Sequence, residues 1–149
     1  MWESSVKGYE TFEHGADVGI RGIGDTLEEA LSESLKALAS LLVEDISFLE
    51  ERPYLSYPLH LEAEFLDELF VQFINRVLSL SYSENALLYE FEGKIENIEG
   101  SYYLKGVVKG VSFDFERYGF GVEVKGATFT MAKIEKSNSH YIAQCVVDV

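Results

Sequence analysis

The chain has 149 residues, of which 47% are hydrophobic, and its 26 acidic and 12 basic residues give a net charge of −14. This size and apolar content predict one globular domain, residues 1–149, and exclude a disordered tail. The negative charge disfavours direct nucleic-acid binding and suits a cation or a basic protein partner. No apolar run could span a membrane, and Met1–Ser5 lacks the features of a signal peptide. With Cys145 as the single cysteine, these features predict a cytoplasmic protein without disulfides or a membrane anchor.

The first third of the chain predicts two strands followed by a helix. Tyr9–Glu13 and Val18–Ile23 have the composition of strands, and the glycines of Gly19–Gly24 indicate a tight turn leading into the helix. Their spacing matches neither the dinucleotide nor the phosphate-loop pattern. Thr26 and Glu29 form a capping box, and apolar residues then recur at helical spacing. We therefore expect an amphipathic helix from Thr26 to about Val43.

The middle of the chain predicts a loop, an edge strand and a second helix. Glu44–Pro53 is acidic and reads as a connection, whereas Tyr54–Glu62 alternates and carries Pro58, which favours an edge position. From about Glu64 to Leu80, large apolar residues recur in adjacent pairs at four-residue intervals. This aromatic-rich stripe should be the main packing surface of the domain.

The second half of the chain is dominated by predicted strands. Ser112–Val122 is expected to be a loop that packs through its aromatic residues. The expected strands are Ala86–Ile98, Tyr102–Val111, Ala127–Lys136 and Tyr141–Val149. The sequence therefore predicts an α+β fold in which two amphipathic helices pack on one face of a mostly antiparallel sheet. If the first and last strands share that sheet, the two ends of the chain meet.

A meeting of the chain ends would bring together two carboxylates, Asp17 and Asp148. Both lie in Val-, Ala- or Gly-rich runs, where aspartate is a poor strand residue. Each could be an ordinary solvated carboxylate at a strand end. Alternatively, the two could share one hard cation with the terminal carboxylate of Val149, because oxygen-only sites of high charge suit calcium, magnesium or manganese.

Two further residues are candidates for the same site. His14 lies three residues before Asp17 and could be a ligand or a proton shuttle, but a half-buried imidazole bonded to a backbone carbonyl is the commoner role. The two side chains would face opposite ways on an extended chain unless Gly15 bends it. Lys125 precedes a glycine and a strand, where a lysine is usually a surface residue. Cys145 is expected in the core and not as a nucleophile.

Several spaced motifs together resemble the archease family. The resemblance begins with His14-Gly15-Ala16-Asp17-Val18-Gly19-Ile20 and continues with Gly24-Asp25-Thr26-Leu27-Glu28-Glu29-Ala30. It includes Leu66-Asp67-Glu68-Leu69, Glu123-Val124-Lys125-Gly126-Ala127-Thr128-Phe129 and the ending Val146-Val147-Asp148-Val149. The motifs occur in order and cover nearly the whole chain.

This resemblance implies a function as well as a site. Archeases are small proteins that activate the RNA ligase of tRNA splicing, so the resemblance implies a non-catalytic cofactor that promotes ligase guanylylation and multiple turnover. It also implies a divalent metal, calcium by preference, held by Asp17, Asp148 and Val149, with Lys125 needed for activation and His14 as a possible outer neighbour of the metal.

The chain departs from the family pattern at two positions near this site. Gly15 stands where a threonine is usual, and Thr130 stands where a histidine is common. Both changes could alter the groups around the metal without removing a ligand. Two alternative functions remain open: a chaperone-like binder of RNA-modifying enzymes such as a tRNA methyltransferase, and a metal-dependent hydrolase that uses His14 and Asp17.

Overall fold

The computed structural model describes residues 7–149. Met1–Ser5, which were expected to lack a signal peptide, lie outside the described residues. The described strands form two antiparallel sheets. The five-stranded sheet has the order β1-β2-β8-β6, with β7 also paired to β8. Its strands are β1 (Gly8–His14), β2 (Asp17–Gly24), β6 (Gly126–Ala127), β7 (Lys133–Ser137) and β8 (His140–Asp148). The three-stranded sheet has the order β3-β5-β4, from β3 (Leu55–Ala63), β4 (Ala86–Ile98) and β5 (Ser101–Ser112).

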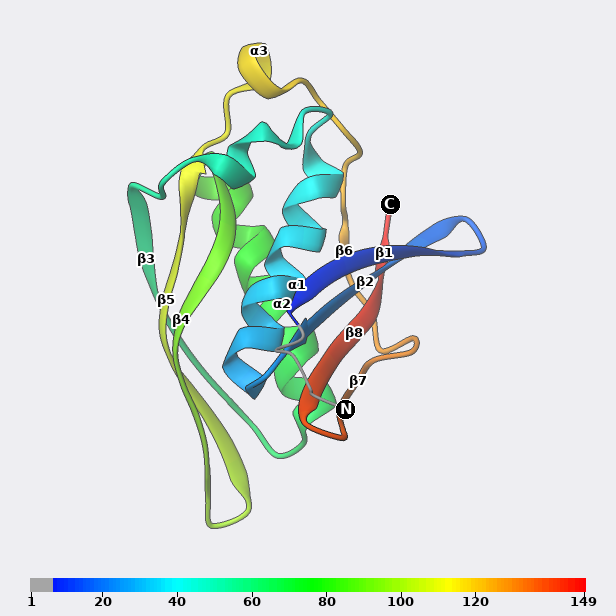
Figure 1. Cartoon of the computed structure of the whole chain (residues 1–149), viewed down its shortest axis with the longest axis vertical. Helices are drawn as coiled ribbons and strands as arrows, with labels where there is room; N and C mark the ends of the chain where they lie inside the picture. The colour runs from blue at the N-terminus through cyan, green and yellow to red at the C-terminus, as the bar shows by residue number, and fades with distance from the viewer. Residues whose placement is uncertain (1–6) are drawn as a thin grey trace, which may run out of the picture.

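Two long helices, α1 (Leu27–Leu42) and α2 (Leu66–Glu84), lie between the two sheets (Figure 1). Side chains of α1 reach β4, since Ser32 Oγ accepts a hydrogen bond from the backbone N–H of Phe91 and Glu28 Oε2 accepts one from Ile95. The α+β class predicted from the sequence is confirmed. The helices contact two sheets, however, and not one face of a single sheet, because the buried stripe of each helix is broad.

The run Gly19–Gly24, predicted to be a tight turn, is strand, and two of its glycines, Gly22 and Gly24, lie against α1. The whole run is strand, paired with β1 on one side and β8 on the other. A Cβ atom at Gly22 would lie 2.1 Å from the backbone oxygen of Ala30 in α1. Glycine is therefore required here because the helix backbone crosses directly over the strand. The predicted cap of α1 is confirmed, with the Glu29 N–H donating to Thr26 Oγ1 at 3.1 Å.

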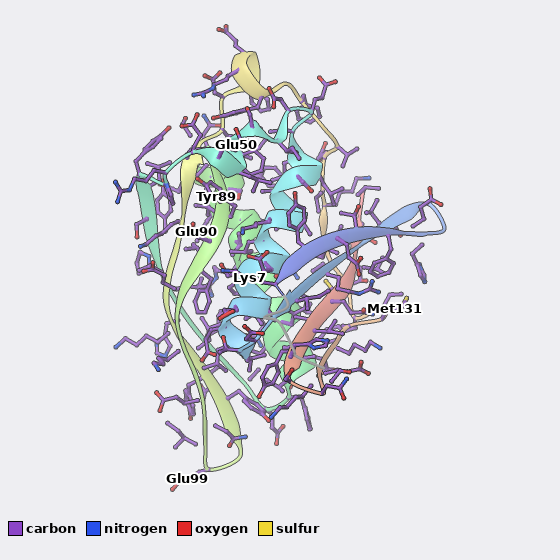
Figure 2. The ribbon with its side chains drawn as sticks, in the orientation of Figure 1. Lys7, Glu50, Tyr89, Glu90, Glu99 and Met131 are labelled. Carbon is purple, nitrogen blue, oxygen red and sulfur yellow. The ribbon has the colours of Figure 1, made fainter. Side chains whose placement is uncertain are left out.

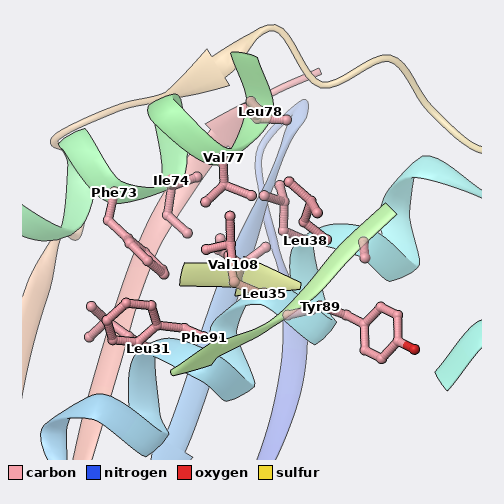
Figure 3. Packing of buried hydrophobic residues seen from close by; sticks show 14 of the residues in the cluster. Leu31, Leu35, Leu38, Phe73, Ile74, Val77, Leu78, Tyr89, Phe91 and Val108 are labelled. Atoms are coloured by element: carbon pink, nitrogen blue, oxygen red, sulfur yellow. The ribbon is translucent and has the colours of Figure 1, made fainter. Parts of the chain in front are cut away.

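The aromatic stripe of α2 forms much of the core, as the sequence predicts. Figure 3 shows side chains of α1, α2 and β4 packed together, including Leu35, Phe73, Val77 and Phe91. The rings of Phe73 and Phe91 meet edge to face with centroids 5.4 Å apart. The helix runs four residues beyond the predicted end at Leu80, because Asn85 adopts the left-handed conformation that ends it.

Three connecting segments differ from their predictions in detail. The loop predicted for Glu44–Pro53 contains a short 3₁₀ helix, η1 (Ile46–Glu50), and Ser112–Val122 contains a single helical turn, α3 (Phe115–Tyr118). The extended run predicted for Ala127–Lys136 is interrupted after β6, because residues 129–131 turn before β7 begins. The predicted edge position of β3 is confirmed by the strand order.

Two further expectations concern the interior and the membrane. Cys145 is fully buried, and this burial raises the pKa of its thiol to about 12, so the thiol is an inert core group at neutral pH. None of the helices within residues 7–149 combines the length and the apolar character needed to cross a lipid bilayer.

Candidate functional site

The two aspartates at the chain ends lie on neighbouring strands. In the pairing of β2 with β8, Val18 lies opposite Val147, and continuing this register by one residue sets Asp17 opposite Asp148. Residues directly opposite each other project from the same face of a sheet. That face is the outer one, because Gly22, an odd number of positions from Asp17, faces α1. The sequence-based expectation that the chain ends meet is therefore met for the backbone.

The end of the chain is tied to both neighbouring strands at this point. The backbone N–H of Val149 donates to Asp17 Oδ1 at 3.3 Å. The backbone N–H of Lys125 donates to the carbonyl oxygen of Asp148 at 2.8 Å. These two bonds place Asp17, Asp148, Val149 and the backbone of Lys125 in one small region, which we call the chain-end site. Figure 1 shows the C-terminus close to the β1–β2 hairpin, where β8 runs beside β2.

The hairpin between β1 and β2 brings His14 to the same region. His14 pairs directly with Asp17, because the chain turns through Gly15, whose φ is +60°. The bend considered as an exception in the sequence argument is thus present, and the two side chains share one face. The imidazole is exposed, so its expected half-buried position is wrong. Among residues 7–149, nothing lies within 4 Å of a Cβ atom placed at Gly15, so the turn beside His14 is open.

The Lys125 side chain is exposed, while its backbone segment is held on several sides. Gly121 and Val122 donate backbone N–H groups to Leu42 and Leu41 at the end of α1, at 3.0 and 2.8 Å. Further along, the Thr128 N–H donates to the carbonyl of Val146 at 3.0 Å. Within residues 7–149 the Lys125 ammonium takes part in none of the ion pairs. The segment is therefore ordered and its lysine is available to a partner.

Two residues of α2 that the sequence argument missed complete this support. The Asn75 amide accepts a hydrogen bond from the Ala127 N–H at 2.8 Å and donates one to the Ala127 carbonyl at 3.4 Å. This side chain therefore makes the two backbone bonds that a neighbouring strand would make with β6. The Tyr82 hydroxyl donates to the Val124 carbonyl at 2.7 Å and accepts from the Val124 N–H at 3.1 Å. Their only signal in the sequence is polarity within a helix whose apolar stripe dominates the pattern.

The bonded hydroxyl of Tyr82 is stable to ionisation at neutral pH. Burial is the largest cause that raises the pKa of Tyr82, the hydrogen bond with Val124 lowers it, and the nearby charge of Glu123 raises it again. Because the net pKa shift is upward, the hydroxyl keeps the proton that it donates to Val124. The anchor of the Lys125 segment is thus independent of pH over the physiological range.

The donor atoms of the chain-end site are oxygens. Two carboxylates face the same side, and the main-chain oxygen of Val149 follows directly. Hard divalent cations prefer such ligands, whereas zinc prefers nitrogen and sulfur. Across the described residues, no three side chains of His, Cys, Asp or Glu converge in a group able to hold a metal ion. Two acidic side chains are therefore what the strands supply, and the remaining donors would be main-chain oxygen and water.

Comparison with known proteins identifies the family. Residues 9–149 match the Archease protein family (MTH1598/TM1083). The chain belongs to the archease family. The archease proteins of Pyrococcus furiosus and Pyrococcus abyssi are both 35% identical to it over 145 residues, which cover 97% of this chain and all of each relative. The archease protein of Methanosarcina mazei is 29% identical over 149 residues, covering 98% of this chain and 99% of that protein.

A solved structure has the same fold. The solution structure of Methanobacterium thermoautotrophicum protein 1598 superposes with a TM-score of 0.79 and covers 95% of this chain and 99% of that one. The sequence identity is 22%, so this likeness concerns the archease fold alone.

The two departures from the archease pattern lie close to the chain-end site. Gly15 occupies the left-handed turn position beside His14, a conformation that glycine adopts without strain. Thr130 lies in the turn after β6, where its carbonyl accepts from the Val146 N–H at 3.1 Å. Both residues are exposed. Neither substitution touches the backbone bonds that tie Val149 and Lys125 in place.

Proposed function

We propose that this archease is a metal-binding protein cofactor that activates a tRNA-splicing RNA ligase by promoting its guanylylation and its multiple turnover. One observation supports the proposal: in a chain that belongs to this family, backbone hydrogen bonds link Val149 to Asp17 and Lys125 to Asp148 at the end of β8. The same residues are the ones singled out by the family resemblance. The chain itself acts as a helper and not as the catalyst.

Asp17, Asp148 and a main-chain oxygen of Val149 would hold a divalent cation, with calcium as the expected ion. A cation bound there would offset the repulsion between the two carboxylates and present positive charge to an anionic group of the partner. Lys125 supplies a second positive charge from an exposed side chain on an anchored backbone. Together they suit contact with phosphate-bearing groups in a ligase active site, although the protein as a whole is strongly acidic.

The test is an assay of the ligase with and without this protein. With excess RNA substrate, we expect the ligase alone to stop after about one turnover, and we expect added protein to raise both the guanylylated fraction and the number of turnovers. Chelation of divalent metal from this protein before mixing should reduce the effect. Unchanged turnover at saturating protein would refute the proposal. A parallel assay of a tRNA methyltransferase tests the chaperone-like alternative, which expects this protein to act on that enzyme as well.

A further inference from the structure

A second surface, away from the metal ligands, has the features of a protein-docking groove. It is a hollow of about 370 Å³ at the α3 end of the molecule, and the aromatic residues Phe113, Phe115, Phe120 and Tyr82 line it together with Val122. The side chains of Phe115 and Phe120 remain 50% and 55% exposed. Soluble proteins rarely leave adjacent aromatic rings in solvent without a binding role. We call this surface the α3 groove.

The rings of the α3 groove are held in place before any partner arrives. The centroids of Phe113 and Phe115 are 4.6 Å apart, and those of Phe115 and Phe120 are 5.6 Å apart. The Phe113 N–H donates to the carbonyl of Asn85 at 2.8 Å, and Gly121 is bonded to the end of α1. A Cβ atom at Gly121 would lie 2.2 Å from the Leu41 backbone oxygen, so this close approach requires glycine. Binding would therefore cost little ordering of the groove.

The charge around the groove is almost entirely negative. The segments that form it, residues 41–51, 81–85 and 112–125, contain eight acidic residues and two basic ones. One of those bases, Arg117, already forms an ion pair with Glu51. Glu123 lines the hollow itself, and Glu44 Oε1 lies beside Gly119 at its edge. An apolar floor with an acidic rim selects an apolar segment flanked by basic residues.

We propose that the α3 groove docks a basic amphipathic segment of a partner protein, with one or two large apolar side chains inserted among Phe113, Phe115 and Phe120. A second copy of this chain would bring its own acidic rim against the first, and nucleic acid would bring phosphates, so charge disfavours both. The groove is formed by the same run that leads through Glu123 and Val124 to Lys125, so a docked segment would leave the partner next to the chain-end site. The binding itself needs neither metal nor ligase activation.

The experiment uses the full chain and a synthetic probe. The probe is a fluorescein-labelled helical peptide with Leu and Trp at i, i+3 and i+7 and with Lys and Arg at the flanking positions. Two control peptides replace the basic residues by Glu or the apolar anchors by Ala. Fluorescence anisotropy should show binding of the basic probe that weakens with added salt, and much weaker binding of both controls. Amide chemical shifts should change around Phe115, Phe120 and Glu123. Equal binding of the acidic peptide, or shifts at another face, would overturn the proposal.

Variants of exposed residues locate the binding without disturbing the core. Phe120→Ala and, separately, Glu123→Lys should each weaken probe binding by about tenfold or more. Ile98→Ala is the matched control, since Ile98 is also 50% exposed but lies next to Glu99 at the far tip of the β4–β5 hairpin (Figure 2). Unchanged affinity of both groove variants would overturn the proposal. So would a stable dimer in light scattering that Phe120→Ala dissolves, because the occupant would then be a second copy. Thermal melts of each variant establish that it is folded.

Discussion

Asp148 is the residue at which the metal proposal can be tested most directly. It is exposed at the end of β8, so Asp148→Ala should fold, and in metal-free buffer it should be as stable as the parent or slightly more so, because one of two neighbouring negative charges is gone. Calcium should no longer raise its melting temperature, since a ligand stabilises only a state that binds it. Ligase activation should fall with it. Differential scanning fluorimetry with and without calcium makes the measurement.

The control for this variant is Glu96→Ala, which removes an exposed acidic residue from the distant β4–β5 hairpin. It should keep both the calcium response and the activation. A soluble Asp148→Ala protein whose melting temperature still rises with calcium, and which activates the ligase normally, would rule out the chain-end site as the metal site.

A substitution at Lys125 should distinguish metal binding from ligase activation. Its side chain is exposed, and its backbone N–H, not its ammonium, makes the bond to Asp148. Lys125→Ala should therefore leave the calcium response intact while ligase turnover drops by about tenfold or more, as expected for the loss of a charge-assisted contact. Lys94→Ala removes an exposed lysine elsewhere and serves as the control. Full activation by Lys125→Ala would show that its charge does not contact the ligase.

The buried thiol of Cys145 should make the folded protein less stable at alkaline pH. Burial raises the pKa of its thiol from 9.0 to about 12 in the folded state. The unfolded chain then releases this proton near pH 9 and the folded chain does not, so the free energy of unfolding falls as the pH rises from 9 towards 12. Cys145→Ala should show a shallower loss of melting temperature between about pH 8 and pH 11 than the parent. Burial also raises the pKa of Tyr89 to about 12, but this tyrosine is present in both proteins and contributes equally to both. If the melting temperatures of parent and variant fell in parallel with pH, the pH dependence would not come from Cys145.

At the scale of elements, the segment between α3 and β7 depends on α2 for its position. Asn75→Ala removes both hydrogen bonds to Ala127 at a cost of about 1 kcal/mol in stability, because the bonds are exposed. Amide exchange at Ala127 should accelerate, and ligase activation should fall although no proposed contact residue has changed. Gln72→Ala, an exposed residue one turn earlier in α2, is the control. Unaltered exchange at Ala127 would mean that β8 alone holds this strand.

The elements differ in how far the sequence predicts them. The spacing of Leu27, Leu31, Leu35 and Leu38 predicts α1, and the cap at Thr26 predicts its start, because both signals are local. The division of the strands into two sheets was missed, since alternation predicts a strand but not its partner. Gly22 was misjudged for a similar reason: a glycine needed for helix crossing looks in sequence like a glycine needed for a turn.

In the candidate site as well, residues with a local sequence signal could be predicted, whereas those that act through long-range contacts could not. Asp17 and Asp148 stand out because each lies at the end of an apolar strand, and they become neighbours because β2 pairs with β8. His14 was placed in the wrong environment, because its exposure follows from the hairpin turn at Gly15. Asn75 and Tyr82 carry no comparable signal, since each acts on a backbone segment about fifty or forty residues away in sequence.

Over the whole molecule, the surplus of negative charge should govern which partners bind. A net charge of −14 on a chain of 149 residues creates a field that attracts basic surfaces and repels phosphate. The chain-end site and the α3 groove differ in the groups that they add to this negative charge. The chain-end site combines two carboxylates with Lys125, and the α3 groove combines aromatic rings with an acidic rim. A ligase that handles RNA carries basic surface, so it can approach both.

The last prediction concerns the salt dependence of this attraction. Because charge complementarity speeds association and salt screens it over about 8–10 Å at physiological ionic strength, the affinity of the protein for the ligase should fall steadily as sodium chloride is added. Most of that change should appear in the association rate, which biolayer interferometry measures directly. In the same buffers, the protein alone should bind tRNA weakly, because its charge has the wrong sign for counterion release. An Ile98→Ala control should follow the parent curve, while Glu123→Lys should bind the ligase with a shallower salt dependence if the α3 groove takes part. Tight tRNA binding by the purified protein that resists high salt would contradict the partner assignment, since the protein would then recognise RNA itself.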